Sequence, residues 1–133
     1  MYMLDTDMCI YVLKNHSKKL RHKFKVTKDI CISSVTYGEL RFGIEYGEPS
    51  VRAERMSQLD LFTQRLLVES WNEEAAKHYG YIRSLLKKQG NLIGNNDLLI
   101  ASHALSIGSV MVTNNVREFG RVPDLITENW LDL

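Results

Sequence analysis

The chain of 133 residues carries a formal net charge of +1, with 44% hydrophobic and 25% charged residues. This length fits one domain over residues 1–133, and this composition excludes a disordered or fibrous chain. The nearly balanced charge excludes a uniformly basic nucleic-acid coat, although it is compatible with a local basic patch. Cys9 and Cys31 lie in apolar stretches without a CxxC pattern, so we expect reduced core thiols and no zinc site.

The apolar stretches are too short for a membrane span, since none reaches the roughly 18 residues that a spanning helix needs. The N-terminal apolar stretch is interrupted by Asp5 and Asp7, and it lacks both a basic lead and a small-residue cleavage site. We therefore expect a cytoplasmic protein that has no membrane segment.

Short β-type runs alternate with longer helical stretches. The expected strands are Tyr2–Leu4, Ile30–Ser33, Leu67–Glu69 and Val110–Thr113. The expected helices are Met8–Lys14, Lys18–Lys25, Val35–Tyr46, Val51–Leu66, Glu73–Gln89 and Asp97–Ile107, with Gly90 and Gly108 as C-terminal stops. Continuous apolar runs such as "ICIS" and "SVMVT" are typical of a parallel sheet covered on both faces. The sequence therefore predicts an α/β fold with a doubly wound parallel sheet flanked by helices.

Oxygen-bearing side chains follow the predicted strands. In a doubly wound sheet the functional crevice lies outside the carboxyl ends of the strands, where the winding direction reverses. The residues expected at these ends are Asp5-Thr6-Asp7, Ser33-Ser34 and Thr113-Asn114-Asn115. Two carboxylates as close as Asp5 and Asp7 repel each other, so their position requires some compensation.

Glu39 is the second acid of interest. On a helix it shares one stripe with Val35, Phe42 and Tyr46, which would turn this carboxylate toward the interior. The alternative is a slightly rotated helix in which Glu39 joins the solvated side, as most helical glutamates do.

Asp97 opens a helix whose other residues are mostly apolar, so its first turn is expected to meet the core. The alternative is that Asn96 or Asp97 caps this helix and that Asp7 caps the first helix in the same way. Capping alone does not explain why Asp5, Glu39 and Asp97 would share one edge of the sheet. Carboxylates without His or Cys suit a hard divalent ion, Mg²⁺ or Mn²⁺, which indicates phosphodiester hydrolysis.

Four segments carry a resemblance that spans essentially the whole chain: "MLDTD", "ISSVTYGELRFG", "IGNNDLLIASHA" and "VTNNVREFGRV". The sequence resembles the PIN-domain ribonucleases, specifically the VapC toxins of bacterial toxin–antitoxin pairs. The resemblance implies that Asp5, Glu39 and Asp97 are the catalytic, metal-binding acids. It also implies that Thr6 and Thr113 are polar residues that brace them.

The chain departs from the family pattern at two positions. Asp7 stands where the family usually has Asn, and it either adds a charge to the site or caps the first helix. Asn115 stands where many relatives carry an acid, while Glu118 follows three residues later. The fourth ligand of the site therefore stays open between these two residues.

The resemblance also implies an activity and partners. The implied activity is that of a Mg²⁺- or Mn²⁺-dependent endoribonuclease that inhibits translation. The implied partners are a cognate VapB-like antitoxin, which blocks the acidic site, and a second copy of the toxin in a homodimer. The "VTNNVREF" ending is similar to that of enteric toxins that cut initiator tRNA in the anticodon stem-loop, so tRNA is the expected RNA substrate.

A basic segment without any acid runs from Lys14 to Lys28. Leu20 and Phe24, four residues apart, would dock its helix and leave the basic residues outward. The predicted RNA-binding residues are Lys18, Lys19, Arg21, Lys23 and Lys25. The alternative is an ordinary solvated helix face. Trp71 and Trp130 are interpreted as packing anchors.

Two other classes of protein compete with the nuclease interpretation. A phosphorelay receiver domain has a similar fold and an acidic crevice, but it needs a lysine where this chain has Thr113-Asn114-Asn115. A non-catalytic RNA-binding module would keep the basic segment without performing chemistry.

Overall fold

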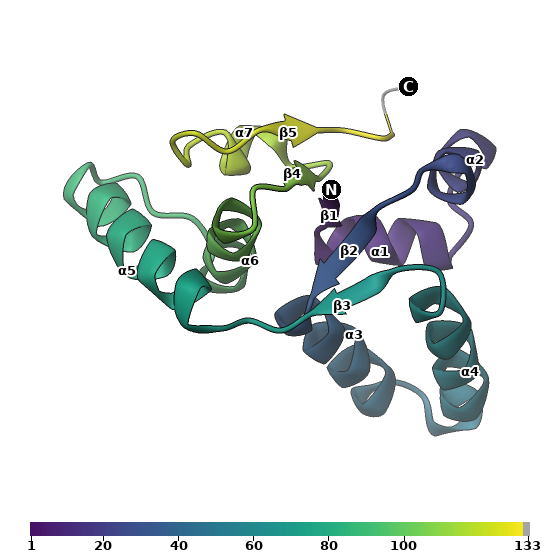
Figure 1. Cartoon of the computed structure of the whole chain (residues 1–133). Helices are drawn as coiled ribbons and strands as arrows, with labels where there is room; N and C mark the ends of the chain where they lie inside the picture. Colours follow the sequence, from purple (N-terminus) through teal and green to yellow (C-terminus); the bar gives the residue numbers. More distant parts are fainter. Residues whose placement is uncertain (132–133) are drawn as a thin grey trace.

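A computed structural model describes residues 1–131 as a five-stranded parallel sheet with helices on both sides (Figure 1). The strands are β1 (Tyr2–Leu4), β2 (Ile30–Ser33), β3 (Leu67–Glu69), β4 (Val110–Val112) and β5 (Thr127–Glu128). The helices are α1 (Thr6–Leu13), α2 (Lys18–Val26), α3 (Ser34–Tyr46), α4 (Arg52–Thr63), α5 (Glu73–Lys88), α6 (Asn95–Ser106) and α7 (Val116–Phe119), with a 3-10 turn, η1 (Pro49–Val51). The predicted α/β class with a parallel sheet is confirmed.

All four predicted strands are present, and the six predicted helices begin and end within about three residues of their expected bounds. Gly90 and Gly108 have positive φ angles of 65° and 67°, which confirms that they stop helices α5 and α6. The prediction missed β5 and α7. Strand β5 pairs with β4 through only Thr127 and Glu128, which is too short for an apolar pattern.

The sheet order β3-β2-β1-β4-β5 places the winding reversal between β1 and β4. From β1 the chain winds outward through β2 and β3, and it then returns to the other edge of β1 to form β4 and β5. All recorded strand pairs are parallel, so the strand ends that carry Asp5 and Thr113 lie at one edge of the sheet. This is the crevice position expected for a doubly wound sheet.

The core consists of two layers, one on each face of the sheet. Neighbouring residues of a strand point to opposite faces, so Leu4 packs with the residues of α1, α2 and α4, while Met3 packs with those of α5 and α6. Cys9 and Cys31 are buried free thiols, one in each layer, as expected. Trp130 is fully buried and confirms its interpretation as a packing anchor.

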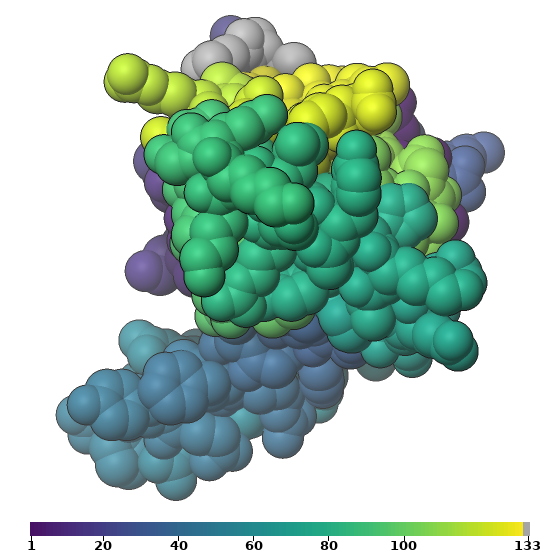
Figure 2. Space-filling view, turned by 90° about the vertical axis from the view of Figure 1, so that its left-hand side faces the viewer, coloured from purple at the N-terminus to yellow at the C-terminus, as the bar shows by residue number. Residues whose placement is uncertain are grey.

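Two parts of the sheet and its helices are more exposed than the sequence predicts. Leu67 and Val68 of the edge strand β3 are 56% and 41% exposed, so the sheet is not covered over its whole width. Phe42 and Tyr46 of α3 are 66% and 82% exposed and stack on each other. The stripe that they share with Glu39 therefore does not face the core as a whole. Figure 2 shows α3 and α4, in blue, projecting from the rest of the molecule.

Within residues 1–131, no helix combines the length and the apolar character that crossing a bilayer requires.

Candidate active site

Asp5 lies buried at the carboxyl end of β1, where the chain turns into α1. Its Oδ1 accepts a hydrogen bond from the backbone N–H of Met8 at 2.8 Å, so Asp5, and not Asp7, caps the first helix. Its Oδ2 accepts a hydrogen bond from the hydroxyl of Thr113 at 2.5 Å. Burial raises the pKa of Asp5 to about 6, although these two hydrogen bonds oppose the shift.

Glu39 projects from α3 with both oxygens bonded. Its Oε1 accepts from the hydroxyl of Thr6 at 2.6 Å, and its Oε2 accepts from the side-chain amide of Asn96 at 2.9 Å. The Thr6 hydroxyl also lies 3.3 Å from that of Thr36, which is fully buried. Glu39 is half-buried, so the alternative of a freely solvated glutamate is wrong. These contacts join α1, α3 and α6 around one carboxylate.

Asp97 lies in the first turn of α6, but it does not cap the helix, because the N-cap residue is Gly94 and has no side-chain bond. The pKa of Asp97 is raised to about 7, mainly by burial, then by the charge and a hydrogen bond of Glu118, and last by the charges of Asp5 and Glu39. All three predicted acids therefore lie within electrostatic reach of one another.

Glu118 reaches the same place from the short helix α7. Its Oε1 accepts from the backbone N–H of Gly94 at 2.9 Å, and its Oε2 accepts from the side-chain amide of Asn115 at 2.6 Å. A Cβ atom on Gly94 would lie 3.5 Å from Glu118 Oε1 and 3.6 Å from Asp97 Oδ2. Both distances are ordinary van der Waals contacts, so Gly94 lies directly against the two carboxylates. The geometry favours Glu118 over Asn115 as the additional acidic group, and Asn115 orients it.

Asp7 is exposed in the first turn of α1, and its charge raises the pKa of Asp5. It borders the site without any hydrogen bond to the other acids among the contacts of residues 1–131. Its contribution is thus one of charge at the rim.

The site concentrates negative charge without a neutralising side chain. In the part of the chain that the structure describes, the two ion pairs are Arg52–Glu45 and Lys77–Glu74, and neither involves the site acids. The donors to these acids are hydroxyls and amides of neutral side chains, together with backbone N–H groups. A carboxylate cluster of this kind suits a bound cation, because the mutual repulsion of the acids is otherwise uncompensated.

Among the described residues, no three or more His, Cys, Asp or Glu side chains are arranged so that they could hold a metal ion together. The donor set nevertheless fits a hard divalent ion. Its carboxylate oxygens come from β1, α3 and α6, and it contains no thiolate or imidazole. The acids would have to exchange some of their present hydrogen bonds for the ion.

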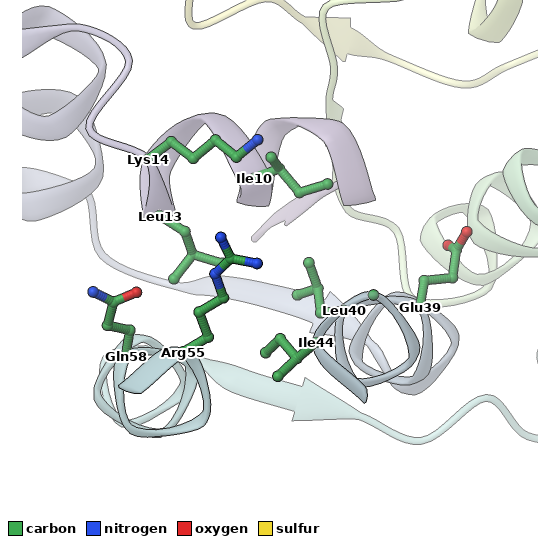
Figure 3. Close-up of a pocket in the computed structure, with 9 residues that line it drawn as sticks. Ile10, Leu13, Lys14, Glu39, Leu40, Ile44, Arg55 and Gln58 are labelled. Atoms are coloured by element: carbon green, nitrogen blue, oxygen red, sulfur yellow. The ribbon is translucent and has the colours of Figure 1, made fainter. Parts of the chain in front are cut away.

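A groove of about 330 Å³ runs from Glu39 between helices α1, α3 and α4 (Figure 3). Its walls are mainly apolar, and Lys14 and Arg55 stand over it on the side away from Glu39. The lining residues are Ile10, Leu13, Lys14, Glu39, Leu40, Gly43, Ile44, Arg55 and Gln58.

Helix α2 displays the basic residues that the sequence predicts to bind RNA. Leu20 and Phe24 are buried, which confirms the predicted docking face, and Lys18, Lys19, Arg21 and Lys25 are exposed. Lys23 is half-buried over the ring of Trp130 at 5.6 Å. The helix precedes β2, so it lies at the amino end of the strands, whereas the acids lie at their carboxyl ends (Figure 1).

Sequence reasoning missed three residues of the site. Thr36 contacts the hydroxyl that holds Glu39, Asn96 binds Glu39 directly, and the backbone N–H of Gly94 binds Glu118. Asn96 was expected only as a helix cap. The adjacency of Asn96 to Asp97 was the one available signal, because the contact with Glu39 spans 57 positions of the chain.

Comparison with known proteins agrees with this geometry. Residues 2–125 match the family model of the PIN domain. "Ribonuclease VapC2" of Rickettsia felis is 39% identical over 132 residues, which are 97% of each chain. "tRNA(fMet)-specific endonuclease VapC" of Shigella flexneri is 42% identical over 130 residues, again 97% of each chain.

Solved structures give the same relationship. The DNA-bound VapBC structure from Salmonella typhimurium contains a chain that superimposes with a TM-score of 0.91 at 40% identity, covering 97% of both chains. The chain from the Rickettsia felis VapBC2 complex, which is bound to a promoter DNA fragment, gives 0.88 at 38% identity, covering 97% and 98%. The receiver-domain alternative is therefore wrong, and this chain belongs to the PIN-domain family, among its VapC ribonucleases.

Proposed function

We propose that this chain is the toxin of a toxin–antitoxin pair and that it hydrolyses tRNA phosphodiesters as an endoribonuclease, which inhibits translation. The observation that supports the proposal is the convergence of Asp5, Glu39 and Asp97 from three separate elements on one uncompensated acidic crevice. PIN-domain ribonucleases depend in general on divalent metal ions. For this chain we propose Mg²⁺ or Mn²⁺, since all candidate ligands are oxygens.

Asp5, Glu39 and Asp97 would hold the cation, and Glu118 would add a fourth carboxylate to this set. A bound divalent ion supplies a water of lowered pKa and neutralises negative charge on the phosphate. Thr113 and Thr6 keep the carboxylates of Asp5 and Glu39 in position through their hydroxyl groups. No side-chain nucleophile is required, and the Ser33–His103 pair, 2.8 Å apart, is buried and has no described contact with the acids.

The substrate proposal rests on the relatives. Two of them, from Shigella flexneri and Salmonella typhimurium, are named tRNA(fMet)-specific endonucleases at 42% identity over nearly the whole chain. We therefore propose initiator tRNA, cut in its anticodon stem-loop, as the substrate. The exposed basic residues of α2, Lys18, Lys19, Arg21 and Lys25, would contact its phosphates away from the cleavage site.

The partner proposal rests on the solved neighbours, which are VapBC complexes. We propose that a VapB-like antitoxin places an apolar segment in the groove of Figure 3, with acidic groups beside Lys14 and Arg55, and thereby blocks access to Glu39. A second copy of this chain is the other proposed partner, and the exposed pair Phe42 and Tyr46 offers an apolar surface for association. The proposed location is the cytoplasm.

The test is digestion of end-labelled initiator tRNA by the purified protein, freed of antitoxin, with Mg²⁺, with Mn²⁺ and with EDTA. Cleavage is expected with the metals only, and Asp5→Asn and Asp97→Asn should each reduce it at least about 100-fold. Asp60→Asn on the exposed side of α4 is the matched control and should cleave normally. Cleavage that survives both site substitutions would exclude the metal-nuclease proposal, and RNA binding without any cleavage would favour the non-catalytic module.

A further inference from the structure

We propose that Trp71, Tyr79 and Arg83 form an RNA subsite beside the acidic crevice. We call these three residues the aromatic ledge. In it, Arg83 binds a phosphate of a single-stranded segment next to the scissile linkage, and the rings offer a face for an unpaired base. This inference rests on the proposed function, because it names the part of the enzyme that receives the substrate strand.

The ledge is a continuous chain of contacts that ends at the site. The guanidinium of Arg83 donates to the Tyr79 hydroxyl at 2.7 Å and lies over the Tyr79 ring, 5.8 Å from its centroid. The Tyr79 hydroxyl in turn donates to the side-chain oxygen of Asn95 at 3.0 Å. Asn95 is exposed and stands two residues before Asp97, so the guanidinium lies within two hydrogen bonds of the turn that carries this acid.

Arg83 is exposed, and none of the ion pairs among the described residues includes it. Its guanidinium is instead held by a neutral hydroxyl and an aromatic ring, which orient the planar group without neutralising its charge. An oriented guanidinium of this kind is suited to bidentate binding of phosphate. Beside a crevice rich in carboxylates, its positive charge offsets the repulsion that a phosphate would otherwise meet.

Trp71 is held more firmly than a surface residue needs to be. Its backbone N–H donates to the Ser34 hydroxyl at 3.0 Å, and its indole N–H donates to the carbonyl oxygen of Leu99 at 2.9 Å. Its ring meets Tyr79 edge to face, with 6.1 Å between the centroids. These bonds tie it to Ser34 at the start of α3 and to Leu99 of α6, the two helices that carry Glu39 and Asp97.

Trp71 and Tyr79 both stay partly exposed despite these contacts. Rigid, half-exposed rings next to a guanidinium are the means by which proteins stack unpaired bases without selecting one sequence. The ledge therefore differs from α2, which offers charge without a half-exposed Trp or Tyr and lies at the other end of the strands. We assign the contact with the single-stranded loop to the ledge and the contact with distant phosphates to α2.

The experiment measures binding and cleavage separately. Binding of a labelled RNA hairpin with an unpaired loop is measured against salt in the Asp5→Asn background, so that the RNA stays intact. Cleavage of the same RNA is measured with the wild-type site. Arg83→Ala and Arg83→Gln should weaken binding about tenfold, lower the slope of log affinity against log salt by about 0.7, and raise KM while kcat is retained. Arg83→Lys should keep the slope, because it keeps the charge.

Tyr79→Phe keeps the ring but loses both hydroxyl bonds, so a smaller loss of affinity, about threefold, is expected. Lys88→Ala is the matched control. It removes an exposed charge from the same helix, about 140° around the axis from Arg83, and should change neither affinity nor slope.

The proposal fails if both Arg83 variants bind with the parent affinity and salt slope. It also fails if kcat at saturating RNA falls while KM stays constant, which would make Arg83 a positioning residue for α6. A parent enzyme that binds this RNA but never cleaves it would overturn the proposed function and leave the binding comparison intact.

Discussion

Asp5, Glu39 and Glu118 are braced by neutral hydrogen-bond donors, and this kind of donor preserves the negative charge of the site. A lysine or arginine would stabilise the carboxylates but would also compete with a cation for them. The Thr113 hydroxyl, the Thr6 hydroxyl and the Asn96 amide orient Asp5 and Glu39 without cancelling their charge. The described side chains therefore leave the mutual repulsion of the acids uncompensated, and a bound cation would compensate it.

Thr113→Val tests this bracing. Valine matches the shape of threonine but loses the hydroxyl that donates to Asp5, and this hydrogen bond lowers the pKa of Asp5. The pKa of Asp5 should rise from about 6 by about one unit in the metal-free protein, followed by carboxyl NMR during a pH titration. Thr63→Val, at the exposed end of α4, should leave it unchanged. An unaltered titration of Asp5 in Thr113→Val would contradict the prediction.

Asp97→Asn should stabilise the metal-free protein at pH 8. The pKa of Asp97 is raised from 3.8 to about 7, so the folded state holds this proton more tightly than the unfolded state does. The stability that Asp97 contributes therefore falls as the pH rises from about 4 to about 7, and the full penalty applies above that range.

Asparagine removes the charge, so the free energy of unfolding should increase by about 1–2 kcal/mol, which corresponds to about 3–6 °C in Tm. Thermal unfolding at pH 8 and pH 4 measures it, and the gain should vanish at pH 4. Asp60→Asn is the control and should show no gain at either pH. Equal Tm values for Asp97→Asn and the parent at pH 8 would show that the acids are not under strain.

Asp5 was predictable because it follows an apolar strand, whereas the apolar stripe through Glu39 is largely exposed, so Glu39 was found through the family resemblance. Of their partners, Thr6 and Thr113 were expected from the resemblance, whereas the Asn96 amide, 57 positions away from Glu39, was not predicted as its donor. Capping was also misassigned. Helix α1 begins at Thr6, two residues before the expected start, and this shift passes the cap from Asp7 to Asp5.

Helix α3 performs two tasks on different sides. It presents Glu39 to the site, while Gly43 leaves space in the groove between α1, α3 and α4. A Cβ atom at Gly43 or at Gly38 would meet nothing within 4 Å, so both positions accept side chains without a clash. Only Gly43 lines the groove.

Gly43→Leu should therefore separate activity from inhibition. Leucine would fill the groove and would also favour the helix by about 0.5–1 kcal/mol. RNA cleavage should remain, whereas the antitoxin should inhibit at least about tenfold less effectively, as measured by titrating it into the cleavage assay. Gly38→Leu should stabilise the helix to the same extent, but it lies outside the groove, so the antitoxin should still inhibit this variant fully. If the antitoxin inhibits both variants alike, it does not use this groove.

The elements that the sequence did not predict are the shortest. Helix α7 has four residues and β5 has two, so each spans about one period of its pattern, which is too little for a repeat to be recognised. Yet α7 delivers Glu118, and β5 completes the sheet edge beside β4. Their positions depend on contacts with parts of the chain that fold around them.

At the scale of the whole molecule, the acids and the basic helix lie at opposite ends of the strands. Helix α1 starts beside Asp5 and spans about 12 Å before the chain turns toward α2. An RNA that touches both surfaces must therefore extend along the protein, as a folded tRNA can and a short fragment cannot.

Alanine substitution of Lys18, Arg21 and Lys25 together should raise KM for full-length tRNA by at least about tenfold and reduce the salt dependence of binding. The same variant should cleave a short oligonucleotide around the scissile bond as the parent does, since that RNA does not reach α2. Steady-state kinetics on both substrates measure this difference. Equal losses on the two substrates would indicate that α2 acts on the site itself.

The hydrogen bond between Asp5 and Thr113 joins the first strand of the chain to the end of its fourth. During synthesis, β1 leaves the ribosome early but gains its β4 neighbour only after some 110 further residues have been added. The candidate active site of a nascent chain is therefore incomplete for most of its translation. Because of this topology, the site for RNA cleavage cannot be completed near the RNA of the ribosome until β4 has been synthesised.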